Sequence, residues 1–200
     1  LLNGLTKLTR FEHWDNRSGD GQISDISAFA AVSSLTELKL GGMSISDLTP
    51  LTGMTQLRQL DLRDNFVENL SPLAGLSGLE VLHLKSNQIS DISALSELNQ
   101  MRVLHLKKNA IRDIGPLIKL TRLISLDLQG NQIEEIEAIS GMNNLNWLAL
   151  GFNRIKSIEP LKNLSRLRHL YLESNRLAGG QLAPLTGLKH LRSLSLRGNQ

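Results

Sequence analysis

The 200-residue sequence has no cysteine, a single tyrosine and no long run of apolar residues. Without cysteine, the segment has neither disulfide-bonded caps nor a cysteine nucleophile, which suits a cytosolic protein and a bacterial exported protein equally well. The longest apolar run covers residues 28–32, far short of the ~18 residues that identify a membrane span. No basic stretch followed by an apolar stretch opens the sequence, so no signal peptide is visible.

A strong excess of one charge is also missing, because 22 Lys and Arg stand against 19 Asp and Glu, which gives a net charge of +3. This mild basicity does not indicate a nucleic-acid partner, and we expect none. The sequence contains no G-x-S-x-G, P-loop or H-E-x-x-H motif. We therefore predict that this segment is not an enzyme and carries no cofactor.

What the sequence does contain is a repeat of 22 residues with the skeleton L-x-x-L-x-L-x-x-N-x-I-x-D-I-x-x-L-x-x-L. Met43 holds the asparagine slot in one repeat. The asparagines of this slot, the asparagine ladder, are Asn16, Asn65, Asn87, Asn109, Asn131, Asn153, Asn175 and Asn199. All five prolines share one phase of the period: Pro50, Pro72, Pro116, Pro160 and Pro184. A fixed period of this length indicates a solenoid.

These motifs resemble those of leucine-rich repeat proteins over essentially the whole chain. Residues 23–27 and 89–93 (Ile-Ser-Asp-Ile-Ser) and residues 45–51 are similar to internalins. Residues 133–139 and 155–161 are closer to a protein-phosphatase regulatory subunit that shares the 22-residue subclass. The resemblance implies a binding module. It leaves open an exported bacterial recognition protein and an intracellular scaffold or enzyme-regulating subunit.

The expected fold is α/β: one right-handed leucine-rich repeat solenoid over residues 1–200, with about nine repeats. Leu82 and Leu84 point into the core and His83 points outward, since side chains alternate along a strand. Short parallel strands on a concave face should centre on residues 12, 39, 61, 83, 105, 127, 149, 171 and 195. Short helical turns or extended segments should form the convex face. Because no terminal cap is recognisable, we interpret the segment as the repeat core of a longer protein.

The polar positions of the skeleton have structural explanations. Each ladder asparagine carries donors and an acceptor that can satisfy backbone groups where the chain leaves the strand. Met43 cannot do this, so its turn is expected to be looser or bonded differently. An Asp or Asn two residues after the Ile or Val position is suited to capping a convex helical turn: Asp25, Asp47, Asn69, Asp91 and Asp113.

Function must therefore lie on the outward strand positions. Three of the few aromatic residues gather on two neighbouring repeats, and basic residues stand in the middle repeats. Exposed aromatic residues beside basic ones are typical of a protein-binding hot spot, although scattered surface aromatics are also normal. Ala149 and Gly151 should leave a shallow depression between the aromatic rings. The predicted partner-binding residues are Trp147, Phe152, Tyr171, His169, His105, Lys107, Lys108, Lys85 and Arg63.

Two candidate ion sites are considered, and neither is expected to bind. Asp61, His83, His105 and Asp127 occupy one column on consecutive repeats, but nothing in a flat column fixes tetrahedral zinc geometry. Residues 16–27 imitate the start of an EF-hand loop, but Ser27 stands where the calcium loop needs a bidentate glutamate.

The sequence thus predicts non-catalytic recognition of another protein on the concave face, with no membrane insertion. Export or a cell-surface location is favoured over the cytoplasm by the resemblance to internalins. The alternative is an intracellular scaffold or a regulatory subunit of an enzyme such as a phosphatase. A weaker alternative is polyanion binding along the basic stripe from Arg63 to Lys107.

Overall fold

The computed structural model describes residues 4–14, 23–179 and 182–200. Within these ranges nine parallel strands form one sheet whose order follows the chain, which confirms the predicted α/β solenoid. The strands are β1 (Arg10–Trp14), β2 (Glu37–Gly41), β3 (Gln59–Asp61), β4 (Val81–His83), β5 (Val103–His105), β6 (Ser125–Asp127), β7 (Trp147–Ala149), β8 (His169–Tyr171) and β9 (Ser193–Ser195).

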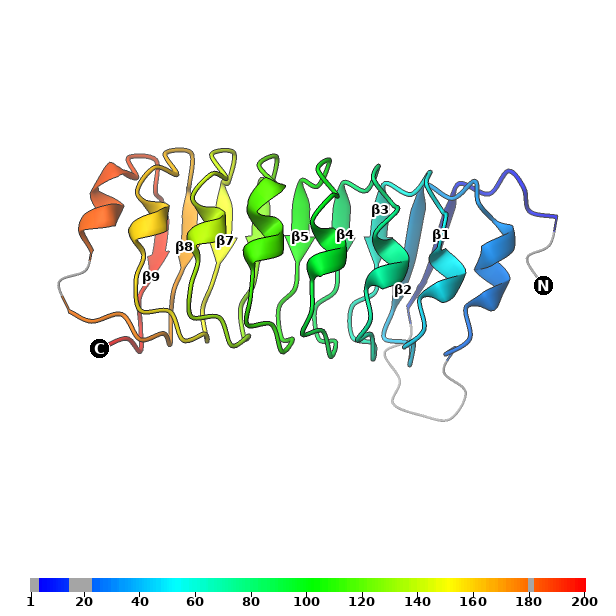
Figure 1. The fold of residues 1–200 in the computed structure, drawn as a ribbon, viewed down its shortest axis with the longest axis horizontal. Helices are drawn as coiled ribbons and strands as arrows, with labels where there is room; N and C mark the ends of the chain where they lie inside the picture. Colours follow the sequence, from blue (N-terminus) through cyan, green and yellow to red (C-terminus); the bar gives the residue numbers. More distant parts are fainter. Residues whose placement is uncertain (1–3, 15–22, 180–181) are drawn as a thin grey trace.

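Short 3₁₀ helices form a second layer in front of the sheet (Figure 1). They are η1 (Ser27–Ala31), η2 (Thr49–Leu51), η3 (Ser71–Leu73), η4 (Ser93–Leu95), η5 (Gly115–Lys119), η6 (Glu137–Ile139), η7 (Glu159–Leu161) and η8 (Ala183–Gly187). In the part of the chain that the structure describes, no helix has the length and apolar character to cross a membrane.

The positions of the strands differ slightly from the prediction. Strands β3 to β9 contain three residues each, and each ends at the residue that was predicted to be its centre. The reason is the turn that follows. After His83 the chain must reach Ser86, whose φ is +54°, so it leaves extended geometry early. The parallel register itself agrees with the repeat, since His83 pairs with His105 and Trp147 with His169.

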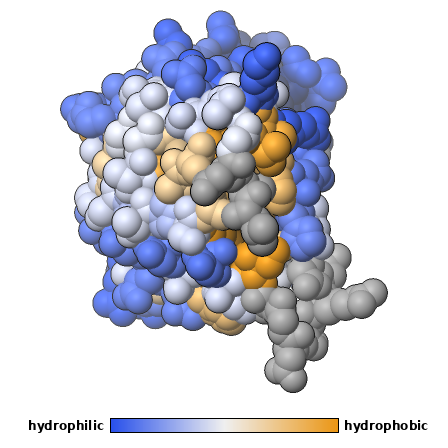
Figure 2. Space-filling view, turned by 90° about the vertical axis from the view of Figure 1, so that its right-hand side faces the viewer, coloured by the Kyte–Doolittle hydropathy of each residue, from blue (hydrophilic) through white to orange (hydrophobic). Residues whose placement is uncertain are grey.

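The core lies between the two layers and runs through the solenoid as one cluster from Ile26 to Leu188. Leu82 and Leu84 are fully buried, and each such side chain stabilises the fold by roughly 1.5–3 kcal/mol relative to an exposed one. Figure 2 faces the N-terminal end, where apolar atoms are visible between hydrophilic flanks. In this first repeat Leu5 is exposed.

Six of the 3₁₀ helices, η1 to η5 and η7, are preceded by a polar residue that bonds their first amide. Asp47 Oδ1 accepts a hydrogen bond from Thr49 N at 2.8 Å, and Asn69 Oδ1 accepts one from Ser71 N at 2.9 Å. Pro50 then occupies the first turn of η2, where a missing N–H costs nothing. The turns are thus bonded as expected for capping residues.

The asparagine ladder links each repeat to the one before it. Asn131 donates from Nδ2 to Leu106 O at 3.0 Å in the preceding repeat and to Leu128 O at 2.9 Å in its own. Its Oδ1 accepts from Ile111 N at 3.0 Å, again in the preceding repeat. The same pattern holds for the other ladder residues that the structure describes, whereas Asn16 lies outside the described residues.

Met43 is fully buried in the ladder slot. Its turn is closed from the next repeat, because Asn65 Oδ1 accepts from both Met43 N and Ile45 N at 3.1 Å. The bonding therefore differs from that of the asparagine turns, and the methionine side chain adds to the core instead.

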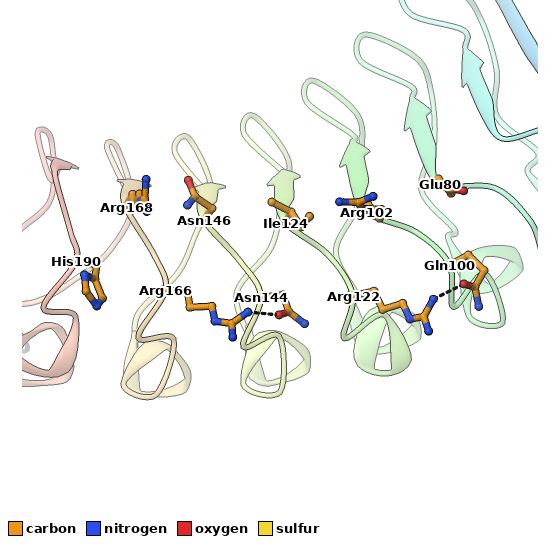
Figure 3. A pocket seen from close by; sticks show the side chains of 10 residues that line it. All are labelled: Glu80, Gln100, Arg102, Arg122, Ile124, Asn144, Asn146, Arg166, Arg168 and His190. Atoms are coloured by element: carbon orange, nitrogen blue, oxygen red, sulfur yellow. Dashed lines mark hydrogen bonds between the residues drawn. The ribbon is translucent and has the colours of Figure 1, made fainter.

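One edge of the solenoid contains a cavity of about 690 Å³, bordered by the segments that lead from each 3₁₀ helix into the next strand (Figure 3). Its lining residues form two rows, one directly before the strands and one two residues earlier. Four exposed arginines lie in these rows, namely Arg102, Arg168, Arg122 and Arg166. We name this cavity the arginine groove.

The ladder generates a stability prediction. Asn131→Ala should lower the free energy of unfolding by roughly 1–3 kcal/mol, because it leaves the buried Ile111 amide without its partner and removes one of two side-chain hydrogen bonds from each of two carbonyl groups. Urea unfolding measures the change. Asn163→Ala is the matched control, since the exposed Asn163 side chain has no hydrogen bond within the described residues. Equal losses in the two variants would contradict this role of the ladder.

Candidate functional site

A row of rings crosses the outward face of the sheet from β4 to β8. The ring centroids of His83 and His105 are 4.7 Å apart, those of His105 and Trp147 are 5.9 Å apart, and those of Trp147 and Tyr171 are 5.7 Å apart. We name these four residues the ring row. Tilted ring pairs at these distances attract one another beyond the burial of their area.

The ring row depends on the small and short side chains of β6. Trp147 stands two strands away from His105, and only Ser125 and Asp127 project outward between them. The indole therefore leans across β6 toward the imidazole, and His105 Nε2 lies 3.1 Å from Ser125 Oγ. Trp147 is half-buried by these contacts. One part of its indole therefore packs against neighbouring side chains, and the other part remains exposed. His169, beside Trp147 in the next strand, has its Nδ1 3.0 Å from Ser193 Oγ.

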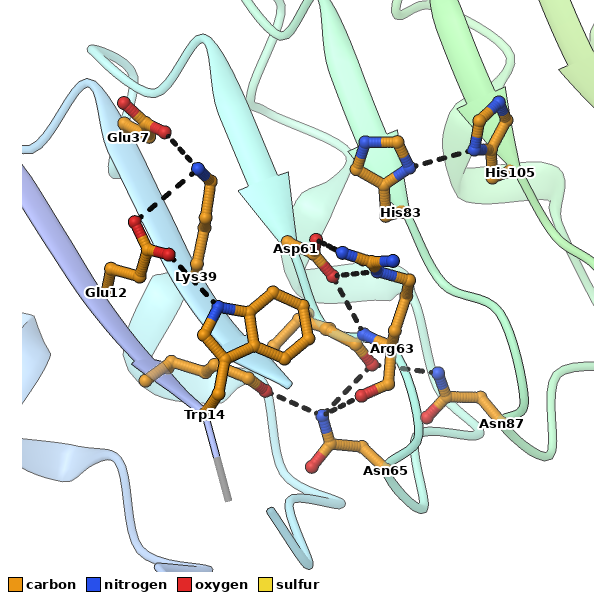
Figure 4. A network of polar contacts seen from close by, with 12 residues as sticks. Glu12, Trp14, Glu37, Lys39, Asp61, Arg63, Asn65, His83, Asn87 and His105 are labelled. Carbon is orange, nitrogen blue, oxygen red and sulfur yellow. Dashed lines mark hydrogen bonds and ion pairs between the residues drawn. The ribbon is translucent and has the colours of Figure 1, made fainter. Parts of the chain in front are cut away.

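The predicted basic residues differ in exposure and in the contacts that hold them. Lys85 and Lys107 are half-buried and Lys108 is exposed. Arg63, in contrast, is held by two groups of the protein (Figure 4). Its guanidinium bonds the carboxylate of Asp61 at 2.8–3.0 Å and lies 4.7 Å from the ring centroid of Trp14. Asp61 is only 1% exposed. The positive charge of Arg63 is therefore largely compensated by a buried carboxylate of the same chain.

Trp14 was not among the predicted site residues. Its indole covers Gly41 so closely that a Cβ at this glycine would lie 2.0 Å from the ring. Its Nε1 donates to Glu12 at 3.2 Å, and Lys39 pairs with Glu12 and Glu37 (Figure 4). The only signal in the sequence was that a glycine stands beside the tryptophan in the outward column.

The two central histidines are neutral and bonded to each other. Their Nδ1 atoms are 3.0 Å apart, so one ring donates and the other accepts. Burial lowers the pKa of His83 to about 4, and the neighbouring His105 adds to this effect while Asp61 opposes it. Burial also lowers the pKa of His105 and raises that of Asp127. Burial thus disfavours the charged forms of all three side chains.

Metal ligation has limited support in this arrangement. Among the residues that the structure describes, no group of three or more His, Asp or Glu side chains could hold a metal ion. The Nδ1 atoms of His83 and His105 face each other, which does not leave them free for a shared ion. Residues 16–22 of the calcium-like segment, which spans 16–27, lie outside the described ranges. The absence of both ions remains a prediction.

The expected depression between the rings is wrong at Gly151. The side chain of Glu173 lies directly over this glycine, where a Cβ would come within 2.6 Å of the carboxylate. Glu173 Oε1 accepts from Gln129 Nε2 at 2.6 Å, so a polar bridge spans two repeats. Glu173 Oε2 is buried and has no hydrogen-bond partner within the described residues. Ala149 is buried beneath its neighbours. The floor is thus filled and polar.

Phe152 is 56% exposed and sits in a strained backbone position with φ +56°. Glycine stands in the same slot at Gly42 and Gly130, which adopt positive φ without strain. A bulky residue in the left-handed region costs of order 1–3 kcal/mol. An exposed aromatic in this conformation does not help the fold, which makes it a candidate for recognition.

From the pH behaviour of the ring row we derive one prediction. The pKa of His83 is about 4 in the folded chain and 6.5 ordinarily. Between these values the unfolded chain binds a proton that the folded chain does not, so stability falls as the pH drops from 6.5 toward 4. His83→Gln should make this loss less steep. Urea unfolding at several pH values measures it, and an unchanged slope would refute the assignment.

A second prediction concerns Phe152. Phe152→Gly should leave the free energy of unfolding unchanged or raise it by up to about 1 kcal/mol, since relief of strain offsets the entropy of glycine. Phe66→Gly is the control, because Phe66 is 53% exposed and does not have positive φ. It should lose roughly 0.5–1 kcal/mol. Thermal unfolding compares them, and a larger loss for Phe152→Gly would show that its ring supports the fold.

The geometry agrees with comparisons to known proteins. The family profile "Leucine Rich repeats (2 copies)" matches residues 55–99, 99–141 and 143–187. The chain belongs to the leucine-rich repeat family. No curated protein matches it significantly, so the relationship to this family rests on the repeats themselves and on solved structures.

Two solved internalins from Listeria monocytogenes are similar to this leucine-rich repeat domain. Internalin C2 has 33% sequence identity and a TM-score of 0.83, with 88% of this chain and 76% of that chain covered. Internalin F has 27% identity and a TM-score of 0.68, with 100% and 70% covered. A leucine-rich repeat protein of Leptospira interrogans has 26% identity and a TM-score of 0.80, with 87% and 46% covered. The domain is therefore internalin-like in fold.

Proposed function

We propose that this leucine-rich repeat domain is a non-catalytic module that binds a protein partner on the outward face of its sheet. The observation that carries the proposal is the continuous ring row from His83 to Tyr171. Large, rigid rings provide contact area at low cost in conformational entropy, and tryptophan and tyrosine are enriched in hot spots.

The surroundings of the ring row suit a protein partner. Exposed Phe152 follows the strand of Trp147, and exposed Lys108 stands in the equivalent slot two repeats earlier. The aromatic side chains can hold apolar groups of the partner, and Lys107 with Lys108 can attract an acidic rim. Arg63, at the end of the predicted basic stripe, is paired with Asp61 and is therefore less suited to attract an acidic rim than the two lysines.

The similarity to two Listeria internalins supports a bacterial exported or surface protein over an intracellular regulatory subunit. The test is to treat intact cells of the source organism with a protease that does not enter them. Cleavage of the full-length protein while a cytosolic marker survives is the expected result. Protection of both proteins would favour the intracellular alternative.

The binding face is tested by photocrosslinking at two equally exposed apolar positions. Phe152 on the sheet side is 56% exposed, and Ile118 in η5 on the helical side is 60% exposed. A photoreactive phenylalanine at position 152 should form a covalent adduct with one partner protein, and the same residue at position 118 should not. Adducts from position 118 alone would place recognition on the other layer.

With that partner purified, Trp147→Ala should weaken binding by about 2 kcal/mol or more, which is about 30-fold in Kd. The expected loss of stability is about 1 kcal/mol, because the indole contacts two rings but is only half-buried. Calorimetry measures the first quantity and urea unfolding the second. Undiminished affinity in a folded variant would show that the partner binds elsewhere.

A further inference from the structure

The arginine groove lies on the edge where the strands begin, outside the ring row. Its lining contains four guanidinium groups and one carboxylate, that of Glu80. None of the ion pairs within the described residues involves Arg102, Arg122, Arg166 or Arg168. Four exposed cations that share one cavity without acidic partners create a positive potential that attracts anionic groups.

Two of these arginines are held in place by neutral groups. Arg166 Nη1 donates to Asn144 Oδ1 at 2.8 Å, and Arg122 Nη1 donates to Gln100 Oε1, each toward the preceding repeat (Figure 3). Asn144 is itself fixed by a bond from its Nδ2 to Thr121 O at 3.0 Å. A guanidinium has five donors, so most remain available, and its charge is not neutralised by these contacts.

The positive charges form two groups in the groove, and the carboxylate of Glu80 lies one strand beyond the first of them. Arg102 and Arg122 lie beside β5 and β6, whereas Arg166 and Arg168 both precede β8. Between them the lining is neutral, with Ile124 as one of the central residues. At roughly 4.8 Å per strand, the centres of the two charged ends are separated by about 12 Å, which an extended chain covers in about four residues.

We propose that the arginine groove binds an extended acidic peptide of a protein partner, with two carboxylate pairs about four residues apart and neutral residues between them. The arginines would bond the carboxylates in bidentate fashion. The amides of Asn144 and Asn146 would bond the peptide backbone in the middle. This surface goes beyond the binding face proposed above and does not depend on it.

A single-stranded nucleic acid fits this groove less well than a peptide. Such ligands bind through bases stacked on aromatic side chains together with a continuous basic track. The lining holds only one ring, that of His190, and its centre is uncharged. Evenly spaced phosphates would therefore face Ile124 and the asparagine amides without a cation.

The probe is a fluorescein-labelled peptide, Gly-Glu-Glu-Val-Ser-Glu-Glu-Gly, measured by anisotropy at physiological salt. The double variant Arg102→Gln/Arg168→Gln should bind it at least ten-fold more weakly, and its fold should be intact because neither side chain has a hydrogen bond within the described residues. Lys85→Gln/Lys107→Gln removes the same charge from the sheet face and should change Kd less than two-fold. A peptide of the same composition with four contiguous glutamates should bind at least three-fold more weakly.

Several results would overturn the proposal. They are no binding of the spaced peptide at millimolar concentration, equal losses in the two double variants, or tighter binding of an oligo-dT strand that the groove variant abolishes. The last result would make the groove a polyanion site. Phe152→Gly should bind the peptide like the unaltered protein. The peptide assay therefore tests the arginine groove alone, and the ring-row proposal is tested by its own binding experiment.

Discussion

From β3 to β9, each repeat that the structure describes depends on one buried cluster of hydrogen bonds, in which an asparagine side chain serves two repeats at once. Asn131 accepts from the amide of Ile111 and donates to two carbonyl groups, each of which also accepts from a neighbouring ladder asparagine, and unpaired backbone groups in a core are costly. The cluster requires the chain to turn sharply after each strand. The residue before the asparagine therefore takes a left-handed conformation, as at Ser86 and Lys108. The closure recurs every 22 residues from Asn65 to Asn175 and again at Asn199.

Because the closure fixes the inward positions, the outward positions line up as columns across the sheet. The ring row uses this alignment and departs from it at one point, where Trp147 leans over Ser125 to meet His105. Burial lowers the pKa of His83, so this ring carries no charge near neutral pH, and its Nδ1 faces that of His105. Side chains that point inward from a strand therefore stabilise the core, and those that point outward are available for recognition. A large ring that packs on its neighbours, such as that of Trp147, contributes to both.

The period determined what could be predicted from the sequence. Counting residues along the repeat places Trp147 beside His169 and His83 beside His105. The repeat does not determine the conformations of long side chains. Glu173 lies over Gly151 to meet Gln129, and Arg63 joins Asp61 and Trp14, because each flexible chain selects the best of several neighbours. The arginine groove was not predicted, because its residues lie before the strands. There the alternation of inward and outward side chains no longer indicates which way each side chain points.

The ladder also has a direction along the chain. Asn109 accepts from Ile89 N and donates to Leu84 O, both in the repeat made before it, and it also donates to Leu106 O and Lys107 O in its own repeat. During synthesis on the ribosome, the amide of Ile89 therefore has no ladder partner until Asn109, 20 residues further along the chain, has been added.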